Sequence, residues 1–477
     1  MKPSLLSAAM AALTAGTAAS AAENPGVTIY RDDNDALFEN GPSPLGEGYA
    51  IVHEQRVLRL AGGRESLVID GLPALLDAEA VSLDLGSGSR VLAQRVLSTG
   101  EGGALAAHRG ETVTIVSRSG DKVRGTLLGV DGGALIVRDD ASSEVSYVRD
   151  YDAVQFTRGS GLPGATLQIS VDGKAGDVPA RLTYPTSGLG WRAAYSAELL
   201  DGSGCRMRLD ALASIANRSG RDYLAAKLKL VAGSPNIVRS GPRPVAYKAA
   251  VAMAPPPEPG LPEQASLGDY RSYTIADALD LPDASVTQVP LYASSELACE
   301  RRWIFENGGA WFPPKPNLQR DYASTSAGPV LSELRFTPTE NLPAGHLRVL
   351  TRDRDGRVEF LGEAHIADTP KGRAVPVALG HAFDLSAKRE RTSFDVDRAA
   401  REMSEGFRVT LTNTGETARS ITVREHPNRW RAWTLVSSSQ KPGKQTPDLL
   451  EFEVAVPANG EATLEYVVKY NWTVKDE

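Results

Sequence analysis

Residues that could catalyse a reaction or bind a metal lie far apart in this sequence. Its six histidines form no H-E-x-x-H or comparable ligand pattern, and none of them neighbours a cysteine. The sequence also contains no G-x-S-x-G nucleophile motif, no P-loop and no EF-hand calcium loop. Local spacing therefore predicts no catalytic residue, no metal and no cofactor, although two distant carboxylates could still meet in the fold, as glycoside hydrolysis requires. The histidines are His53, His108, His346, His365, His381 and His426.

One glycine-rich segment, residues 159–164 (GSGLPG), matches the dinucleotide-binding pattern G-x-G-x-x-G. In a nucleotide site the last glycine begins a helix whose N-terminus faces the pyrophosphate. Here Pro163 lies inside the pattern, and residues 165–171 (ATLQISV) predict a strand instead of a helix. We interpret the segment as a turn between domains.

The clearest candidate for an interaction surface is formed by Arg429, Trp430, Arg431 and Trp433. We predict that this segment lies in a strand whose alternation sends the two tryptophans to opposite faces. One ring would then fill the core, and the other would lie near the surface beside the arginines, where both residue types commonly anchor partners. The alternative is that neighbouring strands cover both rings, because tryptophan is highly buried on average.

A second group of aromatic and basic residues lies earlier in the chain. Trp303 and Trp311 follow closely after Arg301 and Arg302. The same two interpretations apply to these tryptophans, namely a surface anchor or a covered core ring.

The first 21 residues predict a secretory signal peptide. Lys2 precedes an apolar, alanine-rich run over residues 5–13, and Ala19, Ser20 and Ala21 supply small residues for cleavage after Ala21. No later apolar run is long enough to cross a bilayer. We therefore expect a periplasmic or secreted protein without a membrane span after cleavage.

Export affects the interpretation of Cys205 and Cys299, the only two cysteines. An oxidising compartment permits them to form a disulfide. The alternative is two separate buried thiols, which pack as small hydrophobic groups.

The composition is that of a globular protein. Of 477 residues, 42% are hydrophobic and 23% charged. This length allows roughly two to four domains. The formal net charge of -7 and the scattered basic residues argue against a nucleic-acid partner, because neutralising phosphates requires clustered Lys and Arg.

Short alternating runs of apolar and polar residues, separated by turns rich in Gly and Pro, predict an all-β fold of tandem antiparallel β-sandwiches. Residues 22–100 predict the N-terminal β-sandwich part, and five short runs within 101–158 predict an inserted small SH3-like or Sm-like β-barrel. Residues 159–388 predict a central β-sandwich, in which the Pro/Ala-rich residues 239–268 form a flexible loop. Residues 389–477 predict an immunoglobulin-like C-terminal β-sandwich.

The pattern Tyr-Pro-x-x-Gly-x-x-Trp-x-x-x-Tyr occurs at Tyr184, Pro185, Gly188, Trp191 and Tyr195. It is similar to the start of an uncharacterised bacterial domain family, domain of unknown function 4139, which also forms the C-terminal half of mucoidy-inhibitor-like proteins. The resemblance implies a β-rich envelope protein and supplies no catalytic residues. It extends over residues 27–472 through NRSGRD (217–222), LKLVAG (228–233), NLPAG (341–345), FRVTLT (407–412) and VPANGEATLEYVVKY (456–470).

Together these features predict an exported, non-enzymatic protein that acts by protein–protein or cell-envelope interaction. Its expected partner is an unknown envelope protein or glycan. The alternative is an envelope hydrolase or a carbohydrate-binding protein whose site is assembled only in the fold.

Overall fold

The computed structural model describes residues 24–39, 46–97, 105, 110, 112–118, 120–156, 164–200, 204–233 and 261–476. The elements of this part of the chain are β-strands and two short 3-10 helices, η1 (Asp35–Leu37) and η2 (Val474–Asp476). The all-β fold class predicted from the sequence is therefore confirmed. Among the same residues, no helix has the length and apolar character needed to cross a membrane.

Three predictions fall wholly or mostly outside the described residues. They are the signal peptide with its cleavage site, the turn at residues 159–164 up to position 163, and the predicted flexible loop up to position 260. The end of that loop is not irregular, which corrects the prediction: Glu263–Leu267 form strand β16, paired with β17 (Tyr270–Thr274). Gly268, at a φ of +59°, allows the tight hairpin turn between the two strands.

The chain divides into two compact units. The first contains Met1–Ala193 and Leu212–Ala293, and the second contains Ala194–Ala211 and Ser294–Glu477. The narrower domain boundaries expected from the sequence remain predictions.

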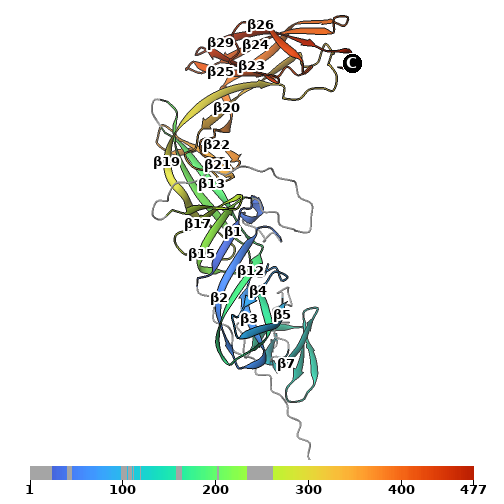
Figure 1. Ribbon diagram of the computed structural model, residues 1–477, viewed down its shortest axis with the longest axis vertical. Coiled ribbons are helices and arrows are strands. Elements are labelled where there is room, and N and C mark those ends of the chain that lie inside the picture. The colour runs from blue at the N-terminus through green and yellow to red at the C-terminus, as the bar shows by residue number, and fades with distance from the viewer. Residues whose placement is uncertain are drawn as a thin grey trace, which may run out of the picture. The chain divides into compact units, whose positions relative to one another are not determined.

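An eight-stranded sheet forms the main part of the first unit (Figure 1). Its strand order is β16-β17-β15-β1-β2-β12-β4, and β18 pairs with β15 beside this path. Burial alternates along β2, so that every second side chain faces the core, as a period of two predicts. The further strands are β1 (Gly26–Tyr30), β2 (Ala50–Leu60), β4 (Ser82–Asp84), β12 (Gly176–Thr186), β15 (Tyr223–Ala232) and β18 (Leu279–Leu281).

A buried charge lies inside this sheet. Glu54, on β2, is 2% exposed. Its Oε1 accepts hydrogen bonds from the Tyr184 hydroxyl (2.6 Å) and from Arg221, and its Oε2 accepts from Arg56 Nη2 (2.7 Å). Burial raises the pKa of Glu54, but the positive charges of Arg221 and Arg56 lower it by a larger amount. The pKa therefore lies below its ordinary value. The core of the first unit therefore holds an ionised carboxylate.

Two smaller sheets complete the first unit. One has the order β3-β11-β5, formed by β3 (Gly63–Leu72), β11 (Ala165–Gly173) and β5 (Ser89–Leu97). The other has the order β10-β6-β7-β8-β9, and its edge strands are not hydrogen-bonded to each other among the described residues. Its strands, which lie where the sequence predicts five runs, are β6 (Thr112–Ser117), β7 (Lys122–Asp131), β8 (Ala134–Asp139), β9 (Val145–Val148) and β10 (Tyr151–Phe156).

The strands of the second unit belong to a sheet with the order β22-β21-β13-β14-β19-β20-β23-β24-β29-β26. Three of these strands, β13, β14 and β19, also contain residues assigned to the first unit. Beside this path β25 pairs with β19 and β28, and β28 pairs with β27. Side chains from strands of the main path and from β25 and β28 beside it form one hydrophobic core around Phe407, Phe452 and Trp430. The strands are β13 (Leu189–Leu200), β14 (Arg206–Asn217), β19 (Ser285–Asn307), β20 (Thr325–Phe336), β21 (Gly345–Arg352), β22 (Val358–Ile366), β23 (Val375–Asp397), β24 (Glu402–Asn413), β25 (Arg419–Glu425), β26 (Trp433–Ser438), β27 (Lys444–Thr446), β28 (Leu449–Val456) and β29 (Gly460–Asn471).

A disulfide joins two segments of the second unit that are far apart in the sequence. Cys205, just before β14, is bonded to Cys299 in β19, with their Cα atoms 4.9 Å apart. The backbone N–H of Cys299 also donates to the carbonyl of Cys205 (2.9 Å). The bridge therefore reinforces a contact that the backbone already makes.

Replacing Cys205 and Cys299 together by serine is expected to lower the free energy of unfolding by about 3–5 kcal/mol, because the bridge restricts the unfolded chain. The two cysteines are 94 residues apart in the sequence, so the closed loop is long. Urea unfolding of the wild type and the double variant measures the difference. Two reactive thiols in the unreduced, unfolded wild type would contradict the bridge.

Candidate functional site

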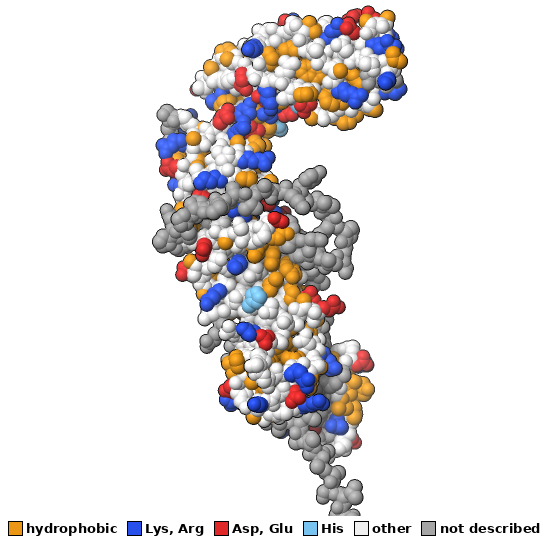
Figure 2. Space-filling view, in the orientation of Figure 1, with side chains coloured by type: hydrophobic (Ala, Val, Ile, Leu, Met, Phe, Trp, Pro, Cys, Tyr) orange, Lys and Arg blue, Asp and Glu red, His pale blue; other side chains and the backbone are white. Residues whose placement is uncertain are grey.

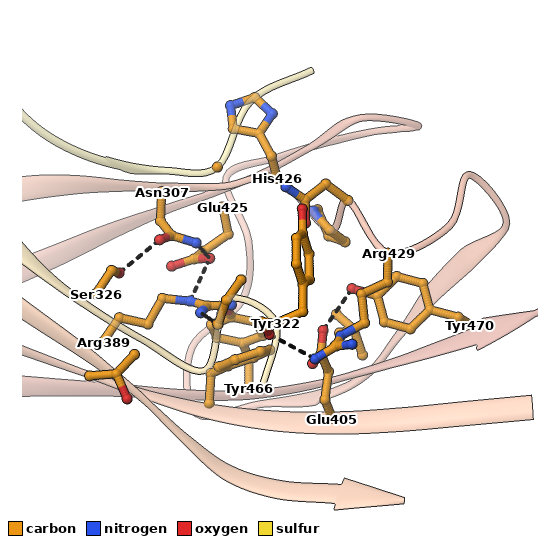
Figure 3. Close-up of a pocket in the computed structure, with 17 residues that line it drawn as sticks. Asn307, Tyr322, Ser326, Arg389, Glu405, Glu425, His426, Arg429, Tyr466 and Tyr470 are labelled. Carbon is orange, nitrogen blue, oxygen red and sulfur yellow. Dashed lines mark hydrogen bonds and ion pairs between the residues drawn. The ribbon is translucent and has the colours of Figure 1, made fainter. Parts of the chain in front are cut away.

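A polar pocket of about 390 Å³ lies in the second unit (Figure 3). Its walls come from the ends of β19 and β25, from β20, β23, β24 and β29, and from the irregular residues 322–323 and 426–429. Charged and hydroxyl-bearing side chains gather around it in a unit whose strands otherwise bury apolar residues.

The charged residues of the pocket occupy positions that strand alternation assigns to the core. Side chains two residues apart on a strand face the same side of the sheet. On each of three strands, a series of buried apolar residues therefore leads to a buried charge, and on β24 the series continues beyond that charge with the buried Met403. The series are Leu385, Ala387 and Arg389 on β23; Leu411, Val409, Phe407 and Glu405 on β24; and Ile421, Val423 and Glu425 on β25.

Glu405 is neutralised by Arg429. Arg429 Nε donates to Glu405 Oε2 (2.7 Å), and the Tyr470 hydroxyl donates to Oε1 (3.0 Å), so both carboxylate oxygens are engaged. Burial, followed by the charge of Glu405, raises the pKa of Tyr470 well above its ordinary value, which keeps the phenol a donor.

Arg429 also holds a segment of irregular backbone. Its Nη1 donates to the carbonyls of Asn317 (3.0 Å) and Gln319 (2.7 Å), and its Nη2 donates to the carbonyl of Tyr322 (2.8 Å). A buried guanidinium with these acceptors satisfies backbone groups that no strand pairs. Arg429 is therefore a clamp that fixes residues 317–322 beside the pocket.

Glu425 and Arg389 form a second buried pair. Arg389 Nε lies 3.0 Å from Glu425 Oε2 and donates to the Tyr466 hydroxyl (3.3 Å). Asn307 Nδ2 donates to the same Oε2 (3.2 Å). The other oxygen of Glu425, Oε1, is buried and has no hydrogen-bond partner among the described residues. It is the one acceptor of the four carboxylate oxygens here that remains unsatisfied.

The titration of Glu425 follows from this environment. Burial raises its pKa and Arg389 lowers it, and the result lies above the ordinary value of a carboxyl group. The pKa of Arg389 is raised despite its burial, because Glu425 and Tyr466 favour the charged form. Arg389 is therefore a permanent cation beside a carboxyl group that retains a proton more readily than usual.

Ala323, in the wall of the pocket, has a φ of +49°, in the left-handed region that residues with a Cβ rarely adopt. Its carbonyl accepts a hydrogen bond from Arg389 Nη1 (2.9 Å). Such a conformation costs on the order of 1 kcal/mol and persists where surrounding contacts impose it. The two arginines thus fix the backbone on this side of the pocket.

His426 is the one histidine among the described residues that line the pocket. His426 Nδ1 lies 2.7 Å from the carbonyl of Asp448, and its Nε2 lies 3.0 Å from Glu306 Oε1, so both ring nitrogens already face oxygen atoms. Across the described ranges, no three His, Cys, Asp or Glu side chains are grouped so that they could hold a metal ion. The pocket offers donors, acceptors and one unsatisfied carboxyl oxygen.

The structure corrects the expectation for the segment that contains Arg429, Trp430, Arg431 and Trp433. Residues 426–432 are not a strand, because Arg429 is drawn inward to Glu405, and β26 begins only at Trp433. Arg429 and Trp430 are 1% and 2% exposed and belong to the interior rather than to a surface. Trp433 is partly exposed and donates through Nε1 to the carbonyl of Pro447 (2.6 Å), and the exposed Arg431 lies over the Trp430 ring at 4.4 Å.

Sequence reasoning missed most of the residues of this pocket. Three of them, Glu405, Glu425 and Arg389, can be recognised in the sequence as charges at core positions. Each lies in a run of apolar residues at every second position, where the alternation of a strand predicts another apolar residue. This pattern does not identify partners, because Arg389 and Glu425 lie on different strands and the partner of Glu405, Arg429, lies in an irregular segment. Arg429 alone was singled out, and the structure places it in the pocket wall.

Comparison with known proteins identifies one family. The family described as "Domain of unknown function (DUF4139)" matches residues 180–474. No curated protein matches the sequence.

Glu405→Gln is expected to destabilise the protein by about 3 kcal/mol, because it leaves Arg429 buried without a counter-charge. Glu465→Gln is the matched control: Glu465 pairs with Arg408 (2.8 Å) on an exposed face, so its loss should change stability by less than about 1 kcal/mol. Urea unfolding measures both variants. Equal effects of the two substitutions would contradict a buried ion pair at Glu405.

Glu425→Gln tests the raised pKa of Glu425. The folded pKa lies above 4.5, the ordinary value of a glutamate carboxyl group. Protonated Glu425 therefore stabilises the fold at low pH, and this contribution is lost as the pH rises through the folded pKa. The stability of the wild type relative to the variant should therefore fall between pH 4 and pH 8, because glutamine does not titrate. Unfolding curves across this range measure the trend, and a relative stability that rises with pH would show that the pKa is lowered instead.

Proposed function

Because the chain belongs to the DUF4139 family, whose function is unknown, we propose a function from the pocket: the protein is an exported β-protein that binds a partner in the cell envelope without catalysing a reaction. The observation that carries the proposal is the pairing of charges around the pocket. Glu405 has both oxygens engaged and Glu425 has one engaged, so the pocket lacks two free carboxylates. Acid–base hydrolysis of glycans requires such a pair.

The geometry of the pocket supports binding. Its walls are fixed by internal ion pairs and by backbone carbonyls held on Arg389 and Arg429. A site whose polar groups are already oriented loses little conformational entropy when a ligand enters. A volume of about 390 Å³ accommodates a side chain or a short loop of a protein partner.

The cellular location is part of the proposal. The expected signal peptide with cleavage after Ala21 places the mature chain in the periplasm or outside the cell. The bridge between Cys205 and Cys299 supports an oxidising compartment, since such bonds are rare in the cytosol.

Finer fold assignments are also proposals. The order of the five-stranded sheet, in which the last strand pairs beside the first, supports the small SH3-like or Sm-like barrel. The strands of the main path and the strands beside it, which share one core, support an immunoglobulin-like sandwich in residues 389–477, beside the sandwiches proposed for the rest of the chain. The relation to mucoidy-inhibitor-like proteins rests on the sequence resemblance.

We propose an envelope protein as the partner, with a glycan as the alternative. A nucleic acid is disfavoured by the net charge of -7. On the face shown in Figure 2, basic and acidic side chains are interspersed, which supports the same conclusion.

Affinity capture from the native envelope tests the proposal. Wild-type mature protein should retain a reproducible envelope protein, and Thr325→Trp should reduce its yield at least about tenfold, because the indole would fill the mouth of the pocket beside the exposed Thr325. Thr463→Trp, on an exposed position of β29 that does not line the pocket, is the control and should capture normally. Equal capture by all three proteins would contradict a role for the pocket.

A hydrolase remains the second candidate function, and one observation favours it. Glu425 has a raised pKa and an unpartnered oxygen, which are properties of a general acid. Incubation of the mature protein with envelope glycans and peptides, followed by product analysis, tests this candidate. Products that form with the wild type and not with Glu425→Gln would favour the hydrolase over the binding protein.

A further inference from the structure

Two arginines lie side by side at the end of β25 that is farther from Glu425. Trp303 on β19 pairs with Ile421 on β25 in a parallel register. Arg301 and Arg419 each precede these partners by two residues, so they lie on the same face of neighbouring strands. This is the face on which Phe305 and Ile421 enter the hydrophobic core. Both arginines therefore lie at the edge of the hydrophobic core around Phe407, Phe452 and Trp430.

The contacts of these arginines include no carboxylate. Arg301 Nη2 donates to Ser332 Oγ (3.0 Å), and Arg301 Nε is buried without any hydrogen-bond partner. The Arg419 guanidinium lies over the Trp303 ring, 4.4 Å from its centroid. Within the described ranges neither arginine forms an ion pair, whereas the buried Arg389 and Arg429 each have a glutamate partner.

The surrounding charges disfavour two positive charges at this position. Burial lowers the pKa of Arg301, and the neighbouring charge of Arg419 lowers it further. The nearby carboxylates lie on the other face of β19, where Arg302 is within 4.0 Å of Glu333 and within 3.4 Å of Glu451. An anion beside these two arginines would therefore stabilise both charges.

We propose that Arg301 and Arg419 form a binding site for an oxyanion, either a carboxylate or a phosphate group of a ligand. The partly exposed Arg301 supplies one positive charge, and Arg419, positioned by Trp303, supplies the second. The site is distinct from the pocket around Glu405 and Glu425 and does not depend on the function proposed for that pocket.

Thermal unfolding with two probes tests the site. Inorganic phosphate represents a phosphate ligand, a tetraglutamate peptide represents a carboxylate ligand, and sodium chloride at matched ionic strength is the reference. Either probe at about tenfold its dissociation constant should raise the Tm of the wild type by about 2–4 °C above the reference. The probe that acts at the lower concentration identifies the source of the oxyanion.

Three variants separate this site from general salt effects. Arg301→Gln and Arg419→Gln should each abolish the response, and Arg301→Gln should raise the Tm at low ionic strength, since it removes a buried like-charge contact. Arg408→Gln, which removes an exposed arginine paired with Glu465, should leave the response unchanged. A wild type that responds to neither probe, or a response that persists in both Arg301→Gln and Arg419→Gln, would overturn the proposal.

Discussion

A charge that enters the interior of a β-sheet protein must find an opposite charge there, and the rest of this structure depends on that constraint. Burying an unpaired carboxylate costs several kcal/mol, so the surrounding strands must supply a cation in the right register. In the described part of the chain, three sets of a glutamate, an arginine and a tyrosine meet this requirement. The sets are Glu54, Arg221 and Tyr184 in the first unit, and Glu405, Arg429 and Tyr470, and Glu425, Arg389 and Tyr466 in the second.

The two sets of the second unit, unlike the set around Glu54, line the polar pocket and help to fix its shape. Arg429 and Arg389 use their remaining donors on backbone carbonyls between Asn317 and Ala323. The same ion pairs that satisfy buried charges therefore fix an irregular segment and a left-handed Ala323 beside an open polar cavity. Stability and the shape of the site are coupled, so a substitution in either pair should affect both.

Much of the fold could be predicted from the sequence, because alternation is a local property. The strands over residues 407–412 and 461–470 follow directly from apolar residues at every second position, and the all-β class follows from many such runs. The segment from Arg429 to Trp433 shows the limit of this reasoning. Its residue types suit a strand, but the contact of Arg429 with Glu405 and with the carbonyls of residues 317–322 determines its course, and no local pattern contains that information.

The site was less predictable than the fold for the same reason. Glu405 and Glu425 stand out in the sequence as charges in phase with core residues, yet the sequence does not show their partners. Arg389 meets Glu425 from another strand, and Arg429 meets Glu405 from an irregular segment, so both pairings depend on the tertiary fold. A search for charges at core positions would have found the pocket residues without revealing their pairing.

A double-mutant cycle between Glu405→Gln and Arg429→Gln tests the central claim most directly. If the two side chains form a buried pair that holds the pocket, their unfolding free energies should be coupled by at least about 2 kcal/mol, with the double variant less destabilised than the sum of the single ones. Additive effects within about 0.5 kcal/mol would show that the two charges do not depend on each other, and would contradict the pairing on which the pocket rests.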